Sequence, residues 1–457
     1  MTQSMEEEKA HAFSGRKVLV YGSGLSGKGA AALLEKLGAQ PFIYDDNMEA
    51  LPLATDEMAF AVVSPGVPLD KPQVVALKEA GVPIIGEVEL AYRAGDGRVF
   101  AITGTNGKTT TTSLLGEIMK ANQPSVFVVG NIGTPYTSVA TETTKDSVVV
   151  AEISSFQCES TVDFHPVVSA ILNITEDHLN RHHTMEEYCR VKESITKNQT
   201  KDDVCVLNYE DGELRRFAGE CPARVVFFSS QRELPEGLFL RGDKIIMRRR
   251  GGFAGETDGV AADEVRETEL VETEKLHVIG IHNFENIMAA AAMAEAGGVP
   301  VNVIRQAIYD FKAVAHRIEY VGKKRGVVWY NDSKGTNPDA AIKGIQAMKW
   351  PTLLIGGGYD KGSDYRPWIR AFDGKVKYLV LEGKTSEDIR AAALECGYPA
   401  ERIVMKENMT EAMRFCAENA EDGDAVLLSP ACASWGEFPN YEVRGQVFKD
   451  FFEALND

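Results

Sequence analysis

Short apolar runs alternate with longer helix-like segments along the whole chain. Near the N-terminus, the strand-like run Lys17–Tyr21 leads through a glycine turn into the Ala-rich stretch Lys28–Leu37 and then the short strand Pro41–Tyr44. Such a strand–helix–strand repeat places two parallel strands in one sheet and covers them with the helix. The alternation continues to the C-terminus, and it predicts an α/β fold built on parallel sheets.

A second alternating pattern begins after the Gly-Asp-Gly segment at residues 95–97. The strand candidate Val99–Ile102 runs into another glycine turn and the helical stretch Thr110–Lys120. Two later apolar runs, Val148–Ala151 and Val167–Leu172, are expected in the same sheet.

The end of this second region has a different character. The segment Arg241–Glu274 is charged and Gly-rich, which predicts irregular hairpins and loops outside the core. The Ala-rich helix Asn283–Ala296 follows it. After about Ala313 a third alternating pattern starts, with strands expected at Val327–Tyr330, Thr352–Ile355, Tyr378–Leu381 and Ala425–Leu428.

The length of 457 residues exceeds what one hydrophobic core usually supports, so the three patterns are interpreted as three domains. The boundaries are expected at 1–94, 95–313 and 314–457. The first and third domains are predicted to be Rossmann-like. The central domain is predicted to be a P-loop-type mononucleotide-binding domain.

Composition narrows the class of protein. The 67 acidic residues outnumber the 49 basic residues, and a formal charge of -18 repels a nucleic-acid backbone. The seven cysteines are scattered and form no C-x-x-C pair, which favours reduced thiols and a cytoplasmic location. No apolar run approaches the roughly 18 residues of a membrane span. The expected protein is therefore a cytoplasmic monomer without nucleic-acid or membrane partners.

The second glycine turn, Gly104–Thr109, reads Gly-Thr-Asn-Gly-Lys-Thr between a strand and a helix. Its backbone N–H groups and the helix N-terminus suit a phosphate. Lys108 would neutralise the β- and γ-phosphates of ATP, and the Thr109 hydroxyl would bind Mg²⁺. The spacing is two residues shorter than in the usual P-loop, and a plain glycine turn before a helix is the structural alternative.

The first glycine turn, Gly22–Gly27, also lies between a strand and a helix, with Asp45 and Asp46 about twenty residues further on. This pattern matches a dinucleotide fingerprint and by itself suggests NAD. Any nucleotide diphosphate can use the same N–H groups. The turn therefore predicts a nucleotide site without fixing its ligand.

The loop at Gly104–Thr109, preceded by Thr103, resembles the T-G-T-N-G-K-T signature of the Mur ligase family. Six more segments match that family in order over nearly the whole chain: Gly130–Pro135, Glu152–Gln157, Asn173–His178, His282–Asn286, Asn331–Asn337 and Ser429–Ser434. The resemblance implies an ATP-dependent, amide-bond-forming ligase of peptidoglycan precursor synthesis. Within the family the segments look like the members that add D-glutamate to UDP-N-acetylmuramoyl-L-alanine.

The resemblance implies roles for residues of the central domain and beyond it. The expected catalytic residues are Lys108, Glu152, His178 and Lys192, and Mg²⁺ is expected at Thr109, Glu152, His178 and Lys192 if that lysine is carbamylated. From sequence alone Glu152 and Lys192 could be solvated charges and His178 a helix cap. The expected ATP-binding residues are Gly104, Thr105, Asn106, Gly107, Lys108, Thr109, Thr110, Asn283, Asn286, Arg317, Asp332 and Lys334.

Two further sets concern the other substrates. The first glycine turn is expected to bind the UDP of the precursor. The UDP set is Gly24, Leu25, Ser26, Asp45, Asp46, Ser64, Pro65, Gly66 and Asn131. D-glutamate carries two carboxylates, which need a cation and hydroxyl or backbone donors. The D-glutamate set is Thr336, Lys361, Ser434, Trp435 and Tyr441.

Four alternatives stay open. Another Mur-type ligase would add a different amino acid, but the chain lacks the Asp-Asn-Pro-Arg sequence of ligases for diamino acids. A folylpolyglutamate synthase would lack the N-terminal UDP-binding unit. An NAD-dependent oxidoreductase would leave the second phosphate loop unused, and a non-catalytic binding module would have little use for Lys108, Glu152 and His178 together.

Overall fold

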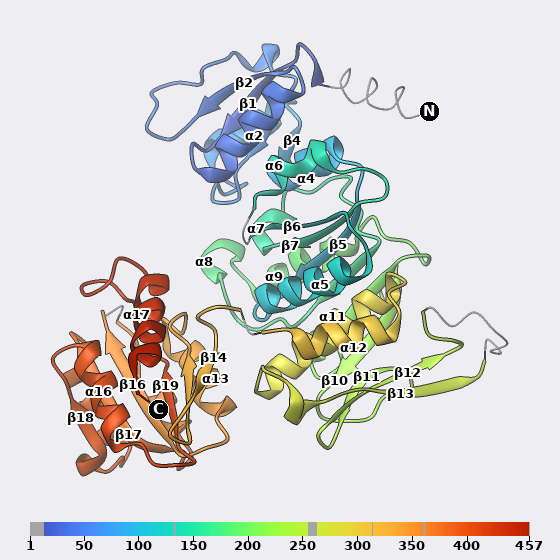
Figure 1. The fold of residues 1–457 in the computed structure, drawn as a ribbon. Coiled ribbons are helices and arrows are strands. Elements are labelled where there is room, and N and C mark those ends of the chain that lie inside the picture. Colours follow the sequence, from blue (N-terminus) through green and yellow to red (C-terminus); the bar gives the residue numbers. More distant parts are fainter. Residues whose placement is uncertain (1–12, 132–133, 255–262, 313, 360–361, 457) are drawn as a thin grey trace. The chain divides into compact units, whose positions relative to one another are not determined.

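A computed structural model describes residues 13–131, 134–254, 263–312, 314–359 and 362–456 (Figure 1). These residues form three β-sheets, each covered by helices. The α/β class with three sheet-containing domains is therefore confirmed. Among the described residues, no helix combines the length and apolar character that a bilayer crossing requires.

The N-terminal sheet has four parallel strands in the order β2-β1-β3-β4. Apolar side chains of β1 point alternately to the two faces, so that Val18 and Val20 pack with α2 while Leu19 and Tyr21 pack with α3. The elements are β1 (Lys17–Tyr21), α2 (Leu25–Lys36), β2 (Gln40–Tyr44), β3 (Phe60–Val63), α3 (Pro72–Glu79), β4 (Ile84–Gly86) and α4 (Glu87–Ala94).

The central sheet has nine strands in the order β13-β12-β11-β10-β9-β8-β5-β7-β6. The two later apolar runs lie in the same sheet as β5, as expected, and β7 and β8 pair with β5 on its two sides. The strands of its parallel part are β5 (Arg98–Thr103), β6 (Val126–Gly130), β7 (Val148–Glu152), β8 (Val168–Ile171), β9 (Val204–Asn208) and β10 (Arg224–Ser229). The helices are α5 (Lys108–Asn122), α6 (Tyr136–Val139), α7 (Ser155–Cys158), α8 (Leu179–His182), α9 (Met185–Glu193), α10 (Gly212–Phe217), α11 (Ile281–Ala296) and α12 (Val301–Asp310).

The charged segment Arg241–Glu274 was expected to form irregular hairpins and loops outside the core. Hairpins are present, but they extend the central sheet and bury some of their side chains. Three strands extend the central sheet there: β11 (Gly237–Arg241), β12 (Lys244–Arg250) and β13 (Val265–Glu272). Their charged side chains form ion pairs on one face, such as Arg248 with Glu267, while Ile246 and Leu270 are buried. A half-exposed antiparallel ribbon produces this mixed pattern.

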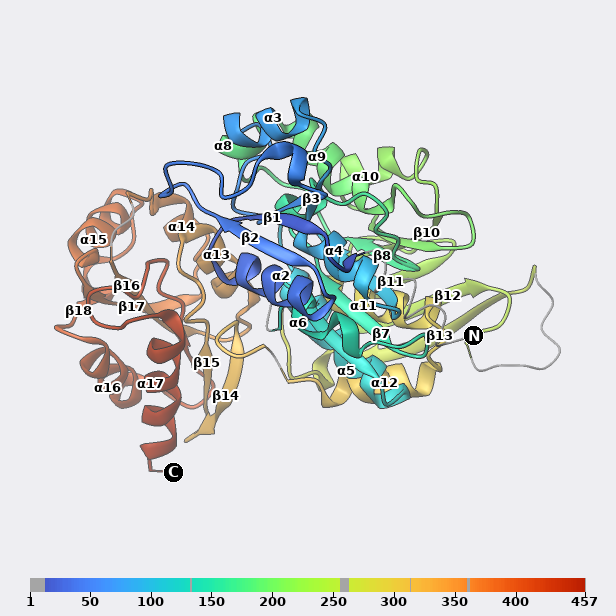
Figure 2. The ribbon, with the colours of Figure 1, turned by 90° about the horizontal axis from the view of Figure 1, so that it is seen from above.

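The C-terminal sheet has six strands in the order β14-β15-β19-β16-β17-β18, and only the β14–β15 pair is antiparallel. Figure 2 shows α13, α14 and α15 on one side of this sheet and α16 and α17 on the other. The strands are β14 (Glu319–Lys324), β15 (Val327–Asn331), β16 (Thr352–Gly358), β17 (Val376–Gly383), β18 (Ile403–Met405) and β19 (Ala425–Leu428). The helices are α13 (Pro338–Ala347), α14 (Arg366–Arg370), α15 (Ser386–Glu395), α16 (Met409–Asn419) and α17 (Tyr441–Ala454).

The chain divides into two compact units. The first comprises residues 1–272 and 285–308 and holds the N-terminal and central sheets, and the second comprises 273–284 and 309–457 and holds the C-terminal sheet. The finer boundaries expected after residues 94 and 313 stay predictions, and residue 313 lies outside the described residues.

Candidate active site

The loop Gly104–Thr109 connects the end of β5 with the start of α5, as the sequence predicts. Gly107 is the N-cap of α5 with a left-handed φ of 86°, and a Cβ there would lie 2.2 Å from Asn286 Oδ1. The position therefore requires glycine. The first N–H groups of α5 have no acceptor within the helix, so this end of the helix suits an anion.

A second segment holds the loop in its shape. The side-chain oxygen of Asn173 accepts a hydrogen bond from Asn106 N (2.8 Å). The backbone carbonyl of Asn173 accepts one from Thr105 N (2.9 Å). Thr105 Oγ1 also bonds with both backbone groups of Thr175 and with the Tyr188 hydroxyl. Because these contacts fix Thr105 and Asn106, the first half of the loop is rigid.

Two lysines meet at one carbonyl of this loop. Lys108 Nζ donates to the carbonyl of Gly104 (2.8 Å) and to that of Thr105 (2.9 Å), and Lys192 Nζ donates to the Gly104 carbonyl from α9 (2.9 Å). Lys192 is almost wholly buried. Burial, reinforced by the positive charge of Lys108, lowers the pKa of Lys192 to about 7. A large fraction of Lys192 is therefore neutral at physiological pH.

Glu152 ends β7, next to the strand that leads into the loop, since it pairs with Ile102 of β5. Its side chain is buried: Oε1 accepts a hydrogen bond from Asn131 Nδ2 (3.1 Å), and Oε2 has no hydrogen-bond partner in the described part of the chain. A buried carboxylate oxygen without a partner is unfavourable unless a cation or donor completes it. The expected position of Glu152 beside the loop is thus observed.

These groups fit a magnesium ion held jointly with a nucleotide. Among the described residues no three His, Cys, Asp or Glu side chains gather as a ready metal site. Mg²⁺ in phosphoryl-transfer enzymes needs only one or two protein ligands, because phosphate oxygens and water supply the rest. The unsatisfied Oε2 of Glu152 and the hydroxyl of Thr109, beside Lys108, match that smaller requirement.

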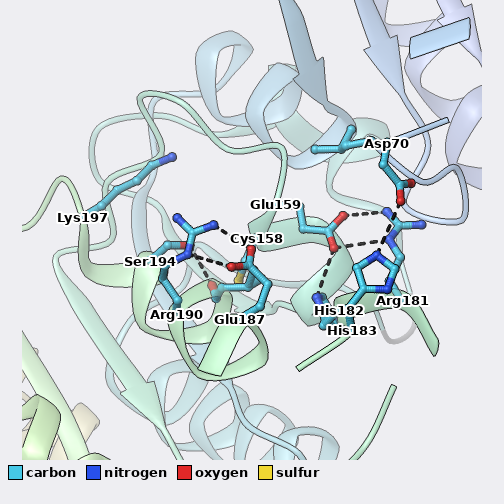
Figure 3. Close-up of a pocket in the computed structure, with 12 residues that line it drawn as sticks. Asp70, Cys158, Glu159, Arg181, His182, His183, Glu187, Arg190, Ser194 and Lys197 are labelled. Carbon is cyan, nitrogen blue, oxygen red and sulfur yellow. Dashed lines mark hydrogen bonds and ion pairs between the residues drawn. The ribbon is translucent and has the colours of Figure 1, made fainter. Parts of the chain in front are cut away.

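His178 lies just before α8 in a left-handed conformation (φ 54°) and packs on the Phe156 ring, with 4.9 Å between ring centroids. A network of ion pairs and hydrogen bonds near His178 connects α7 with α8. Figure 3 shows the Glu159 carboxylate between Arg181 and His182, at 2.6 Å from Arg181 Nη2 and 3.3 Å from His182 Nδ1. His182 Nε2 and Ser155 Oγ are 3.0 Å apart. The ion pairs of this 470 Å³ cavity thus fix α7 and α8.

The first glycine turn borders a separate cavity of about 470 Å³ in the first unit. Gly27, the last residue of this turn, packs against its first residue, since a Cβ on Gly27 would lie 1.8 Å from the Gly22 carbonyl oxygen. Leu25, three-quarters exposed, stands at the start of α2. All but one of the residues predicted to bind UDP line the cavity: Gly24, Leu25, Ser26, Asp45, Ser64, Pro65, Gly66 and Asn131.

The exception is Asp46, and the two aspartates have different surroundings. Asp45 accepts hydrogen bonds from Ser23 Oγ (2.6 Å) and Ser23 N (3.2 Å), which lower its pKa. Asp46 instead pairs with Lys71 and accepts a bond from the Tyr21 hydroxyl (2.6 Å). The structure therefore directs Asp45 toward the cavity and engages Asp46 elsewhere.

Sequence reasoning assigned no role to several residues that line this cavity. Glu87 is buried with Oε1 accepting from Gln157 Nε2 (2.9 Å), and Tyr136 and Gln157 also border the space. Gln157 belongs to a recognised segment, but its side chain gave no signal of its own. Glu87 begins α4 and had no motif around it.

In the second unit, candidate residues gather where β15 and β19 end. Asp332 is fully buried and accepts hydrogen bonds from Ser429 Oγ (2.7 Å) and Ile318 N (3.3 Å). Burial raises its pKa to about 7, opposed by Ser429 and the nearby Arg317. Arg317 stands between two residues with positive φ, His316 (65°) and Ile318 (45°), and its Nε has no hydrogen-bond partner among the described residues.

The remaining residues of this unit lie around the same edge. Lys334 Nζ lies 5.3 Å from the centre of the Tyr441 ring, and Thr336 is half-buried in the following turn. Ser434 is buried, while Trp435 is 55% exposed and lies 6.1 Å from the Tyr359 ring. Lys361 lies outside the described residues.

One buried arginine in this unit was not anticipated. Arg444 of α17 donates to the Ser333 hydroxyl and carbonyl and to the Cys432 carbonyl, and so connects the two segments that follow β15 and β19. Burial lowers its pKa to about 10. An arginine on a helix gives no sequence signal for such a structural position.

Asn283 and Asn286 of α11 have different partners. Asn286 Oδ1 accepts a hydrogen bond from Thr111 of α5 (3.3 Å) in the first unit. Asn283 belongs to the second unit, where its Nδ2 donates to the Ile279 carbonyl (2.7 Å). The expectation that both amides serve one ligand therefore stays a prediction.

The fold and the loop at the end of β5 define a P-loop-type α/β protein with a second nucleotide-sized cavity. The Mur ligase middle domain matches residues 102–294, and the Mur ligase, glutamate ligase domain matches residues 316–432. The UDP-N-acetylmuramoylalanine–D-glutamate ligase of Lachnoclostridium phytofermentans is 53% identical over 97% of this chain and 99% of its own length. That of Clostridioides difficile is 42% identical over 95% and 98%. The chain belongs to the Mur ligase family.

Solved structures agree on the fold. The UDP-N-acetylmuramate-alanine ligase MurC of Thermotoga maritima superposes with a TM-score of 0.58 at 19% identity, over 96% of this chain and 99% of its own. The MurF ligase of the same organism, solved in complex with ADP, gives 0.55 at 17% identity over 97% and 96%. These similarities extend over the three sheets of the chain.

Proposed function

We propose that this protein is an ATP-dependent ligase that adds D-glutamate to UDP-N-acetylmuramoyl-L-alanine in peptidoglycan precursor synthesis. The observation that carries the proposal is one chain with a lysine-bearing phosphate loop and a separate nucleotide-sized cavity, joined to full-length relatives named for this reaction. One site supplies the triphosphate, and the other holds a nucleotide-linked acceptor.

The reaction proceeds in two steps. The alanine carboxylate of the precursor attacks the γ-phosphorus of ATP and releases ADP, which leaves an acyl phosphate. The amine of D-glutamate then attacks the acyl carbon, loses a proton, and expels inorganic phosphate as the new amide forms. No protein nucleophile takes part, so the chain acts by positioning and by stabilising charge.

The loop residues have defined roles in this proposal. Gly104–Thr110 and the N-terminus of α5 surround the phosphates, and Lys108 neutralises charge on the transferred phosphoryl group. Mg²⁺, when bound, neutralises the triphosphate and polarises the γ-phosphate. Glu152 and the Thr109 hydroxyl would hold the ion, and His178 would contribute from the start of α8.

Lys192 is the proposed carbamylated residue. Its neutral amine adds to CO₂, loses one proton and becomes an anionic carbamate that can bind a cation. The pKa of about 7 supports this step, because only the unprotonated amine is a nucleophile. Detection by ¹³C NMR after adding labelled bicarbonate tests it, and the same spectrum from Lys192→Arg should lack the carbamate signal.

The cavity of the first unit and the edge of the C-terminal sheet support the proposed sites for the precursor, ATP and D-glutamate. Gly24, Leu25, Ser26, Asp45, Ser64, Pro65, Gly66 and Asn131 would hold the UDP precursor. In the second unit Arg317, Asp332 and Lys334 would contact ATP, while Thr336, Lys361, Ser434, Trp435 and Tyr441 would hold D-glutamate. Asn283 and Asn286 would contact the adenosine.

Phosphate release with ATP, UDP-N-acetylmuramoyl-L-alanine and a panel of amino acids tests the whole proposal. We expect turnover with D-glutamate and at least a hundred-fold less with L-glutamate, L-lysine or diaminopimelate. L-Lysine would leave the partners of one carboxylate unpaired, L-glutamate has the opposite configuration at Cα, and diaminopimelate has a longer side chain with a second amine. Mass spectrometry of the product confirms the amide. Turnover with a diamino acid in place of D-glutamate would contradict the assignment.

The thiols bear on the proposed cellular location. All seven cysteines are free, which supports the proposed cytoplasmic location. The expectation of a monomer stays a prediction, and light scattering of the purified protein tests it.

A further inference from the structure

Four residues form a row along the carboxyl edge of the N-terminal sheet. The register aligns Tyr44, Tyr21, Val63 and Gly86 across β2, β1, β3 and β4. The residue after each of these lines the cavity: Asp45, Gly22, Ser64 and Glu87. Because neighbouring strands lie about 4.8 Å apart, the row extends for about 14 Å.

The row has a direction. The strand order reverses between β1 and β3, and ligands of parallel α/β sheets bind at such a point. The glycine turn at this point suits a diphosphate. Asp45 lies one strand away on one side, and Glu87 lies two strands away on the other.

Glu87 carries an unsatisfied group at its end of the row. Its Oε1 accepts from Gln157, whereas Oε2 is buried and has no hydrogen-bond partner among the residues that the structure describes. Within the same described residues, the Ser64 hydroxyl, one strand closer to the turn, is also buried without a partner. Two such atoms in one cavity are costly in a protein alone and are accounted for by a polar ligand.

The surrounding structure holds Glu87 in place. Gly86 N donates to the Ser160 carbonyl, and a Cβ on Gly86 would lie 2.1 Å from Ser160 Oγ. Gln157 is fixed in turn, because its Oε1 accepts from Ser154 N and Oγ in a capping box of α7. Burial also raises the pKa of Glu87.

We propose that Glu87 is a specificity-determining residue that binds the sugar of the nucleotide-sugar precursor, accepting a hydrogen bond on Oε2 from a sugar hydroxyl or amide N–H. This inference rests on the proposed function. A ligand with its uridine near Asp45 and its diphosphate at the glycine turn places its sugar toward β3 and β4. The alanine carboxylate then continues toward Asn131, which lines the same cavity and donates to Glu152.

Three ligands of increasing length locate the contact. Binding of UDP, UDP-N-acetylglucosamine and UDP-N-acetylmuramoyl-L-alanine is measured by calorimetry for the unaltered chain, Glu87→Gln, Glu87→Ala and Glu79→Gln. Glu79 is an exposed glutamate of α3 and serves as the matched control. We expect both Glu87 variants to bind the two sugar-containing ligands about ten-fold more weakly and UDP within two-fold of the unaltered chain.

Other outcomes overturn the inference. Equal weakening of UDP would place Glu87 at the nucleotide, and weakening of the muramoyl ligand alone would place it at the peptide end. Unchanged binding of all three ligands would make it a structural acid. Glu87→Gln preserves the side-chain volume, so its melting temperature should stay near that of the unaltered chain, and it decides the matter if Glu87→Ala does not fold. If the unaltered chain itself fails to bind the muramoyl ligand, the proposed function fails instead.

Discussion

The first unit contains two glycine turns with the same local construction and different surroundings. Each follows a buried parallel strand and opens a helix, with glycines where a side chain would collide. The turn after β1 has an acid as its partner, since Ser23 donates to Asp45. The turn after β5 has two lysines, because Lys108 and Lys192 both donate to Gly104.

This difference teaches that the turn and the ligand are specified separately. Backbone N–H groups at a helix start suit any phosphate, so the turn alone does not distinguish NAD, UDP or ATP. The side chains around it decide whether the phosphate is only held or also transferred. A site that holds a diphosphate needs few cations, whereas phosphoryl transfer needs positive charge at the reacting group.

The largest effect on kcat is expected at Lys108, the cation of the phosphate loop. Lys108→Ala should lower kcat by about a thousand-fold or more, because it removes the cation that stabilises the transferred phosphoryl group. Lys108 bonds to carbonyls of its own loop, so the melting temperature should change little. Lys120→Ala, on the exposed side of the same helix, is the control in the phosphate-release assay. Full activity of Lys108→Ala would remove the distinction between the two turns.

The geometry of the first turn gives the next largest effect. In Gly27→Ala the new methyl would lie on the Gly22 carbonyl, so we expect KM for the muramoyl precursor to rise by about ten-fold or more while KM for ATP stays unchanged. Gly219→Ala, outside both glycine turns, is the control, since the nearest atom to a Cβ there would lie 3.6 Å away. Steady-state kinetics on both variants measure the contrast. Similar KM values in the two would show that the turn does not bind the precursor.

The lysine pair of the second turn makes stability depend on pH. The unfolded Lys192 has a pKa near 10.5 and the folded one about 7, so between these values only the unfolded state binds the proton. Unfolding free energy should therefore rise with pH there, by up to about 1.4 kcal/mol per pH unit, relative to Lys192→Met. Urea unfolding of both proteins in bicarbonate-free buffer at several pH values tests this. Parallel pH profiles would show that Lys192 keeps its proton when folded.

The smallest expected effect on KM distinguishes Asp45 from Asp46, the two acids that follow β2. Asp45→Asn should raise KM for the precursor several-fold, because Asp45 lines the cavity and fixes Ser23. Asp46→Asn should leave KM within about two-fold, because Asp46 is engaged by Lys71 and Tyr21. The same kinetic assay covers both variants. A larger effect at Asp46 would reverse the assignment made from the structure.

Much of the fold follows from local patterns. Buried strands such as Val148–Ala151 and helices such as Asn283–Ala296 are strongly apolar, and the structure contains β7 and α11 there. Edge strands are harder to predict from the sequence, because one of their faces is solvated and charged. The hairpin of β12 and β13 was therefore predicted to be irregular and outside the core, although it extends the central sheet.

The site was predictable only where backbone demands show in the sequence. Glycine turns and the lysine of a phosphate loop have fixed spacings, so Gly104–Thr109 could be found. Glu87 and Arg444 matter through three-dimensional neighbours that are distant in sequence, Gln157 for the first and Ser333 for the second. No local pattern marks such residues. Asp45 and Asp46 could be separated only by seeing which one Lys71 engages.

One carboxylate limits how this protein can be divided. Glu89 of α4 is buried and accepts hydrogen bonds from Val162 N, Asp163 N and Phe164 N at 2.8–3.0 Å, and it also pairs with Arg93. These bonds fasten the helix that ends the first sheet's segment to a loop far along the chain. A chimaera that exchanges residues 1–94 between related enzymes would leave three amides without their acceptor unless the grafted piece brings an equivalent acid.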